Sequence, residues 1–290
     1  MKIGYAGLNY SVECTPSSTF RLKSYSSKRL KEKTKSNLQC LEKILNYNIK
    51  NNILFFRIGS GIVPFASHPI CDVNWQKEFS KEFKRIGKLI KDNNLRITMH
   101  PDHFTILNSL KKKVLKNSIK ELEYHADILD LMELDNSAKI NIHVGGVYNN
   151  KEKAIKRFIK NYKKLPSSIR DRLVIENDEK SYDVTDCLRI NKEINIPITL
   201  DIFHFKLKHR NNNLKEVIKK VVKTWGQKDG LPVFHYSTQD KNKRRGAHAQ
   251  TLNKKEFKKF LKEIKGIDCD IVLEIKDKEK SALKAINLIS

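Results

Sequence analysis

The chain has 290 residues and is strongly basic, with 58 lysines and arginines against 33 aspartates and glutamates and a formal net charge of +25. No apolar stretch approaches the roughly 18–20 residues that a membrane-spanning helix requires, and the first ten residues lack the layout of a secretory signal peptide. The positive charge favours a polyanionic partner, nucleic acid above all, although a genome rich in lysine and asparagine codons would give a similar composition.

The five cysteines are odd in number and scattered, and no two of them form a C-x-x-C motif. This pattern argues against a disulfide framework and against a zinc–thiolate site. We therefore expect a protein of a reducing compartment, which is the cytoplasm, or the nucleus if the host is a nucleated cell.

Short apolar runs alternate along the chain with longer amphipathic stretches. The strands that these runs predict lie at residues 2–7, 53–60, 96–100, 139–146, 173–178, 198–204, 231–238 and 270–276. The stretches between them carry apolar residues at the i, i+3, i+4 spacing of a helix. Eight strands that alternate with helices predict parallel βαβ units, hence an α/β protein. The strand count and the length fit a single (β/α)8 TIM barrel domain over residues 1–290.

Ionisable side chains occur at or near the ends of six of these strands in succession. In chain order they are His100, His143, Glu176, Asp201 with His204, His235 and Glu274. The carboxyl ends of barrel strands converge on one face, where the active sites of such enzymes lie. His68 and His248 are on the loops after the second and seventh strands, above the same face.

Each of these residues has an ordinary explanation when it is considered alone. A histidine at a strand end is commonly a hydrogen-bonded core residue, and a single carboxylate there is commonly a helix cap. Six strands in succession that all follow such explanations would bury many ionisable groups at considerable cost. A cluster of cations removes this cost, because it ligates carboxylates and neutral imidazoles. The sequence therefore predicts a metal site.

The predicted ligands narrow the choice of metal and of chemistry. Imidazole and carboxylate without thiolate suit zinc, manganese or iron. Roughly eight ligands are too many for one ion, so we expect two or three, with a carboxylate such as Glu176 bridging a pair. Such clusters fit phosphoester hydrolysis, because the metals activate water and stabilise the leaving oxygen. Sugar isomerases also place such residues at barrel strand ends, but they usually need fewer histidines and no basic surface.

With these residues located, the chain resembles the ultraviolet damage endonuclease family from end to end. The segments GYAGLNY (4–10), 37–69 and RITMHPDHFTIL (96–107) are similar to the family's first three βα units. HVGGVY, VIENDE, LDIFHF and HYS follow in the family's order. The resemblance implies a metal-dependent barrel related to endonuclease IV. It also implies incision of duplex DNA immediately 5′ of cyclobutane dimers and 6-4 photoproducts, leaving 3′-hydroxyl and 5′-phosphate ends.

The resemblance also implies roles for individual residues. The positions that match the family's metal ligands are His100, His143, Glu176, Asp201, His204, His235, His248 and Glu274. Tyr5, Asn9 and His68 match active-site positions near the lesion, and we expect catalytic roles for Tyr5, His68 and Glu176 and a DNA contact for Asn9. Without the family, Tyr5 could equally be an aromatic residue of the barrel floor. The expected cofactor is two or three divalent ions, Mn²⁺ before Mg²⁺, Zn²⁺ or Co²⁺.

Two positions depart from the family's pattern. His103 and Phe104 match a polar and an aromatic residue that probe the DNA opposite the damage, where the family usually has Gln followed by Tyr or Phe. We expect retained function with an altered lesion preference. Val233 lies where some members carry a lysine that can be carboxylated beside the metals, so that group is excluded here, and a third metal would be weaker or held differently.

A basic stretch, residues 240–250, follows the seventh predicted strand and leads into His248. Its residues expected to contact DNA phosphates are Lys241, Lys243, Arg244 and Arg245. The expected partner is damaged double-stranded DNA, bound by a monomer that has no membrane association. The alternatives are an abasic-site endonuclease of the endonuclease IV type, a sugar isomerase-like barrel, or a DNA-binding barrel without catalysis. Phe104 argues mildly against an abasic-site endonuclease, and the complete set of predicted metal ligands argues against a barrel without catalysis.

Overall fold

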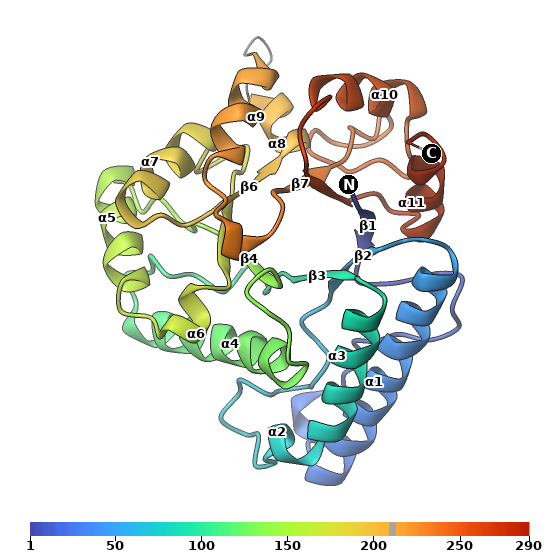
Figure 1. Cartoon of the computed structure of the whole chain (residues 1–290). Coiled ribbons are helices and arrows are strands. Elements are labelled where there is room, and N and C mark those ends of the chain that lie inside the picture. Colours follow the sequence, from blue (N-terminus) through green and yellow to red (C-terminus); the bar gives the residue numbers. More distant parts are fainter. Residues whose placement is uncertain (209–212, 290) are drawn as a thin grey trace.

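Eight parallel strands close into a barrel in the computed structural model, which describes residues 1–208 and 213–289 (Figure 1). The strands are β1 (Ile3–Ala6), β2 (Phe55–Ile58), β3 (Arg96–Met99), β4 (Lys139–His143), β5 (Leu173–Glu176), β6 (Ile198–Asp201), β7 (Val233–Tyr236) and β8 (Asp270–Leu273). Each strand pairs with its neighbours in chain order, and β8 pairs with β1 to close the sheet. The predicted barrel is confirmed.

Helices surround the barrel on the outside (Figure 1). The longer ones are α1 (Ser27–Lys50), α3 (Ser80–Asp92), α4 (Lys112–Leu131), α5 (Lys151–Tyr162), α7 (Val184–Ile194), α9 (Leu214–Val222), α10 (Lys254–Glu263) and α11 (Glu279–Ile286). Shorter ones are α2 (Trp75–Glu78), α6 (Ser167–Arg170) and α8 (Ile202–Lys208). Across residues 1–208 and 213–289, no helix is both long and apolar enough to cross a membrane.

Alternate residues of each strand face the barrel interior and the surrounding helices, as the two-residue period of a strand requires. The small cluster Ala6, Phe55, Val233 and Val272 fills part of the interior, and the larger cluster packs between the sheet and the helices. Because Val233 is buried in this apolar cluster, its position offers no group that could ligate a metal.

The sixth strand is shorter than the sequence suggested. We expected a strand over 198–204, but β6 ends at Asp201 and the chain continues directly into α8. Asp201 Oδ1 accepts a hydrogen bond from the His204 backbone N–H at 2.7 Å, which satisfies a free amide of the first helical turn. His204 therefore reaches the site from a helix. The apolar pattern of residues 202–205 fits a buried helix as well as a strand.

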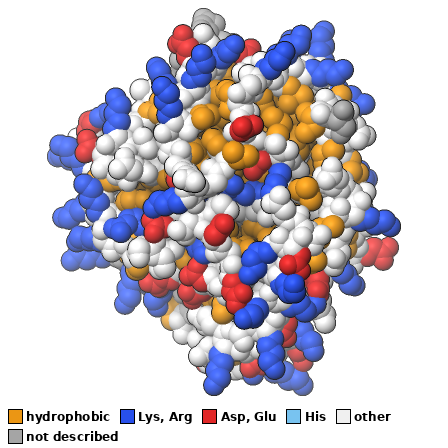
Figure 2. All heavy atoms as spheres, viewed as in Figure 1, with side chains coloured by type: hydrophobic (Ala, Val, Ile, Leu, Met, Phe, Trp, Pro, Cys, Tyr) orange, Lys and Arg blue, Asp and Glu red, His pale blue; other side chains and the backbone are white. Residues whose placement is uncertain are grey.

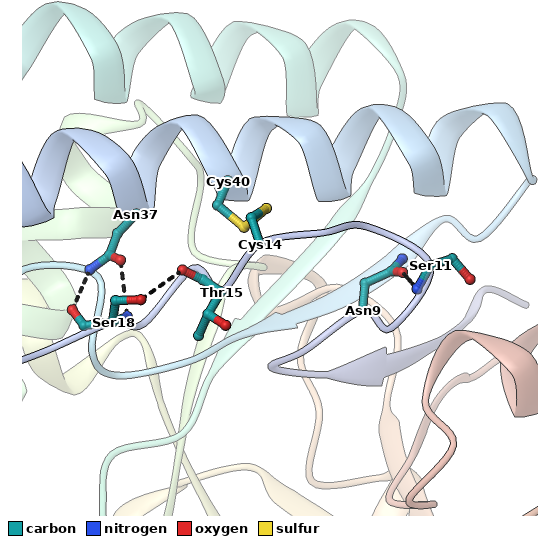
Figure 3. Close-up of a disulfide and its surroundings, with 7 residues drawn as sticks. All are labelled: Asn9, Ser11, Cys14, Thr15, Ser18, Asn37 and Cys40. Atoms are coloured by element: carbon teal, nitrogen blue, oxygen red, sulfur yellow. Dashed lines mark hydrogen bonds between the residues drawn. A yellow bond between two sulfur atoms is a disulfide. The ribbon is translucent and has the colours of Figure 1, made fainter.

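The chain contains a disulfide that the cysteine pattern did not reveal. Cys14, in the loop between β1 and α1, is bonded to Cys40 of α1, 26 residues away (Figure 3). Asn37 of α1 fixes the same loop through hydrogen bonds with the backbone of Ser18. The expectation against disulfides is thus wrong for this pair, because the spacing of cysteines along a chain does not show which of them fold together.

Candidate metal centre

A cavity of about 700 Å³ opens at the carboxyl ends of the strands. The predicted ligands that line it are His100, His143, Glu176, His204, His248 and Glu274. The other two, Asp201 and His235, are almost fully buried and lie within reach of Glu176 and Glu274. The structure therefore brings all eight predicted ligands to one end of the barrel.

Six of these residues form two groups that could each hold an ion. The donor atoms of the first group lie within 4.8 Å of one another and come from His100, His143 and Glu176. The second group, with the same spacing, consists of Glu176, Asp201, His235 and Glu274. Glu176 belongs to both groups, as expected for a bridging carboxylate.

Glu176 is surrounded by hydrogen-bond donors. His235 Nδ1 lies 2.7 Å from its Oε1, His100 Nε2 lies 3.3 Å from its Oε2, and Asn141 Nδ2 donates to Oε2. Burial alone would raise the pKa of Glu176, but His235, His100 and His143 hold it well below its usual value. The residue is therefore a carboxylate, the form that binds cations.

Asp201 is held in place through its backbone and keeps a side-chain oxygen free. Asn177 accepts from its N–H at 2.9 Å and donates to its carbonyl at 3.1 Å. Burial raises the pKa of Asp201 to about 7. Within the described residues, Asp201 Oδ2 and His143 Nδ1 are buried and have no hydrogen-bond partner. Unpaired buried donor and acceptor atoms need an explanation, and a bound cation supplies one.

His204 and His248 lie beside the second group. Their rings are 6.0 Å apart, His248 Nε2 is 3.8 Å from Glu274 Oε2, and His204 Nδ1 is 2.6 Å from Glu179 Oε2. In the described part of the chain they complete no third group of donor atoms with that spacing. The geometry thus fits two ions more directly than three.

Arg57 is a residue of this site that the sequence analysis missed. Its Nη1 donates to Glu274 Oε1 at 2.5 Å and lies 3.4 Å from His235 Nε2. Burial would raise the pKa of Glu274, but Arg57 and His235 lower it strongly. The sequence feature that could have indicated this residue is an arginine inside the apolar run 53–60. Every second residue of a barrel strand points to the interior, so a charged residue near the strand end can reach the mouth.

Tyr5 and Asn9 lie outside the residues that line the cavity. Tyr5 is fully buried, and its hydroxyl donates to Asn48 Oδ1 of α1 and accepts from Asn9 Nδ2, both at 2.7 Å. Asn9 Oδ1 accepts from the Ser11 backbone N–H at 2.8 Å (Figure 3). In this structure the two residues hold the loop after β1 against α1. This arrangement supports a role in positioning that loop.

The remaining predicted residues lie at the rim or beyond it. His68 is exposed, its Nδ1 accepts from the Ile70 N–H at 3.1 Å, and it is not among the residues that line the cavity. His103 lines the cavity and stacks on His143 with ring centroids 5.5 Å apart. Phe104 is 60% exposed. His125 is buried in α4, and His209 lies outside the described residues.

The basic residues after β7 form an exposed tip. Gln239 and His248 pair as an antiparallel bridge, which closes a turn around residues 240–247. The exposed cations at its tip are Lys241, Lys243, Arg244 and Arg245. Arg245 also donates to the Leu207 carbonyl. Because His248 ends this turn and lines the cavity, the tip is connected directly to the rim.

The chain is similar to known proteins over its whole length. The family described as UV-endonuclease UvdE matches residues 1–290. The UV DNA damage endonuclease of Clostridium perfringens (strain 13 / Type A) is 44% identical over 289 residues, which cover 99% of this chain and 70% of that protein. The crystal structure of SacUVDE is also 44% identical, with a TM-score of 0.95 over 100% of this chain and 98% of that chain.

A more distant similarity concerns the fold alone. The crystal structure of endonuclease IV from Thermus thermophilus has a TM-score of 0.61 at 13% identity, covering 99% of this chain and 97% of that chain. This likeness confirms the expected endonuclease IV-like architecture. The family match and the identity to UV DNA damage endonucleases decide the rest: the chain belongs to the UV-endonuclease UvdE family and is a DNA repair endonuclease.

Proposed function

We propose that this endonuclease incises duplex DNA immediately 5′ of ultraviolet photoproducts, leaving 3′-hydroxyl and 5′-phosphate ends, and that it depends on divalent metal ions. The observation that carries the proposal is the pair of donor groups that share Glu176. Two carboxylate-bridged ions suit phosphodiester hydrolysis. The geometry favours two ions, and Mn²⁺ is the expected metal, with Mg²⁺, Zn²⁺ and Co²⁺ as alternatives.

The residues of the site have different roles in the proposed reaction. His100, His143 and Glu176 would hold one ion, and Asp201, His235 and Glu274 would complete the shell of the other with Glu176. Bound ions would activate water and stabilise the leaving oxygen. Arg57 orients Glu274 through a 2.5 Å charge-assisted hydrogen bond.

Damage recognition is assigned to the rim. Phe104 is an exposed aromatic residue on the loop after β3, next to His103, which lines the cavity. A photoproduct is poorly stacked, so its extrusion costs less than the extrusion of normal bases. Phe104 would stack in the vacated space, and the basic tip of residues 241–245 would hold the phosphates. The spread of lysine and arginine over the face shown in Figure 2 adds a general attraction for DNA.

Tyr5, Asn9 and His68 enter the proposal differently. The hydrogen bonds of Tyr5 and Asn9 support a positioning role through the loop after β1. His68 stays a predicted catalytic residue. Because it is exposed on the loop after β2, bound DNA would have to cover it for it to take part in the reaction. We expect the chain to act as a monomer.

The test is cleavage-site mapping on a duplex with one defined thymine dimer, with Mn²⁺ present. The proposal expects one nick immediately 5′ of the dimer in the damaged strand, and no nick after chelation of the metal. A matched duplex with one abasic site separates the alternative activity. Efficient incision at the abasic site without incision at the dimer would replace the proposal with the endonuclease IV type of function.

A further inference from the structure

Two cations line the cavity beside Glu274. Arg57 comes from β2 and is paired with Glu274, and Lys278 comes from the turn between β8 and α11. Lys278 is only partly exposed. Among the described residues, no carboxylate lies within 4 Å of its ammonium group, and no hydrogen bond of that group is formed. A lysine that lines a cavity and makes no direct ion pair or hydrogen bond leaves its N–H donors available for a ligand.

The backbone of Lys278 is strained. Its φ of 49° and ψ of −114° lie in a region that glycine adopts and that other residues rarely occupy. Such conformations persist where the surroundings determine them, and they cluster at functional sites. An observed outlier of this kind therefore points to a role for the side chain that it presents.

The chain on both sides of Lys278 is fixed. The N–H groups of Lys276 and Asp277 donate to the carbonyls of Ala249 and Gln250 at 3.1 and 3.0 Å. After Lys278, the fully buried Glu279 accepts from the Tyr10 N–H and from Ser11 Oγ. These contacts leave the backbone at Lys278 little choice of conformation, and its side chain lines the cavity.

We propose that Lys278 and Arg57 form a phosphate subsite on the wall of the cavity, which binds a phosphodiester oxygen of the DNA strand beside the candidate metal centre. This inference rests on the proposed function, because DNA is the ligand that supplies the phosphate. Burial lowers the pKa of Lys278 and the charge of Arg57 lowers it further, which outweighs the opposite effect of Glu274 and Glu279, so a bound anion beside the two cations would stabilise the charged ammonium. Arg57 is held by Glu274, whereas Lys278 acts as a point charge on a flexible stem.

The first test compares Lys278→Met with Lys280→Met, which removes the same charge from an exposed position on α11. The affinity for plain duplex DNA is measured by fluorescence anisotropy over a series of salt concentrations, with the metal content measured in parallel. Lys278→Met should bind about tenfold more weakly and lose about 1 unit of the log–log salt slope. Lys280→Met should match the unmodified protein, and the metal content should be the same in all three. An unchanged slope in Lys278→Met would overturn the proposal.

A second test uses inorganic phosphate and does not require cleavage. Phosphate should raise the Tm of the metal-free protein, and this shift should be smaller in Lys278→Met than in Lys280→Met. Equal shifts in the two variants would contradict the subsite. If the phosphate effect holds while dimer-containing DNA is not cut, the subsite stands and the proposed function fails.

The strained backbone allows a third test, which compares Lys278→Gly with Lys278→Ala. Both variants remove the ammonium, but only glycine adopts a positive φ at no steric cost. Both should lose the same DNA affinity, and the glycine variant should have the higher Tm. Wild-type affinity in both variants would show that Lys278 has a purely structural role.

Discussion

His235 Nδ1 lies 2.7 Å from Glu176 Oε1, and both side chains are almost completely buried. The contact joins β7 to β5 across the barrel mouth. Burial lowers the pKa of His235, but Glu176 and Glu274 raise it above its usual value overall. In the metal-free protein His235 therefore binds a proton more tightly than a free imidazole does, and a bound cation has to compete with that proton.

Glu176→Gln tests the residue that the two candidate donor groups share. The amide keeps the volume of the side chain but removes the charge that both donor groups use. We expect nicking of dimer-containing DNA to be abolished and the metal content to fall, while circular dichroism shows the same fold. A variant with normal metal content and normal incision would contradict the assignment of Glu176.

Proton displacement predicts a pH dependence of stability without metal. The pKa of Asp201 is about 7 in the folded protein, above its value of 3.8 in an unfolded chain. A group whose pKa is raised on folding contributes stability that is fully present below its pKa in the unfolded chain. This stability is lost as the pH rises through its pKa in the folded protein. The Tm of the metal-free protein should therefore fall as the pH rises from 4 to 7. The Tm of the Asp201→Asn variant should fall less steeply over the same range. His235, whose pKa is also raised, extends the loss above pH 6.5.

The same displacement predicts the effect of adding metal. Ions compete with protons for Asp201 and His235, so the apparent metal affinity should rise between pH 6 and pH 8. Calorimetric titration with Mn²⁺ in two buffers of different ionisation enthalpy measures the protons released. Zero release at pH 6.5 would mean that these two residues do not ligate the metal.

Replacement of Arg244 and Arg245 by alanine tests the basic tip. Both side chains are exposed, although Arg245 also donates to the Leu207 carbonyl. Binding to damaged and undamaged duplex should weaken alike, and the log–log salt slope should fall by about 1 per lost phosphate contact. The matched control replaces Lys160 and Lys192, which are exposed on α5 and α7. If both double variants have the same slope as the unmodified protein, the tip does not contact phosphates.

Phe104→Ala tests damage recognition. A stacking residue contributes roughly 1–3 kcal/mol, so the variant should lose about tenfold or more of its preference for irradiated over plain duplex. Because the side chain is 60% exposed, metal content and Tm should change little. Leu110→Ala is the control, since Leu110 is 62% exposed on the same β3–α4 loop. A loss of Tm with an unchanged damage preference would make Phe104 a packing residue.

The fold and the convergence of the predicted ligands on one end of the barrel could be predicted because they follow from periodicity. Once eight strands are placed in a barrel, residues such as His100, Glu176 and Glu274 must meet at one end. His204 reached the same place although its local structure was predicted wrongly, because a helix that follows the strand end stays at the mouth. Topology therefore placed the ligands more reliably than local pattern.

The parts that were missed depend on the direction of individual side chains. Whether Tyr5 faces α1 or the cavity is decided by a shift of one residue in strand register, which the run 2–7 does not fix. Arg57 was overlooked because it sits inside an apolar run, and Lys278 because its backbone conformation is imposed by contacts with residues distant in the sequence.

The Cys14–Cys40 bond has a consequence for the unfolded chain. Closing a loop across a sequence separation of 26 restricts the denatured ensemble and contributes about 3.5 kcal/mol of stability if the effect is purely one of chain entropy. The bond also anchors the loop that follows β1, whose Tyr10 and Ser11 bind Glu279 next to Lys278. The thiol–disulfide balance of the surroundings thus acts on both the resistance of the protein to unfolding and the rigidity of one side of the cavity rim.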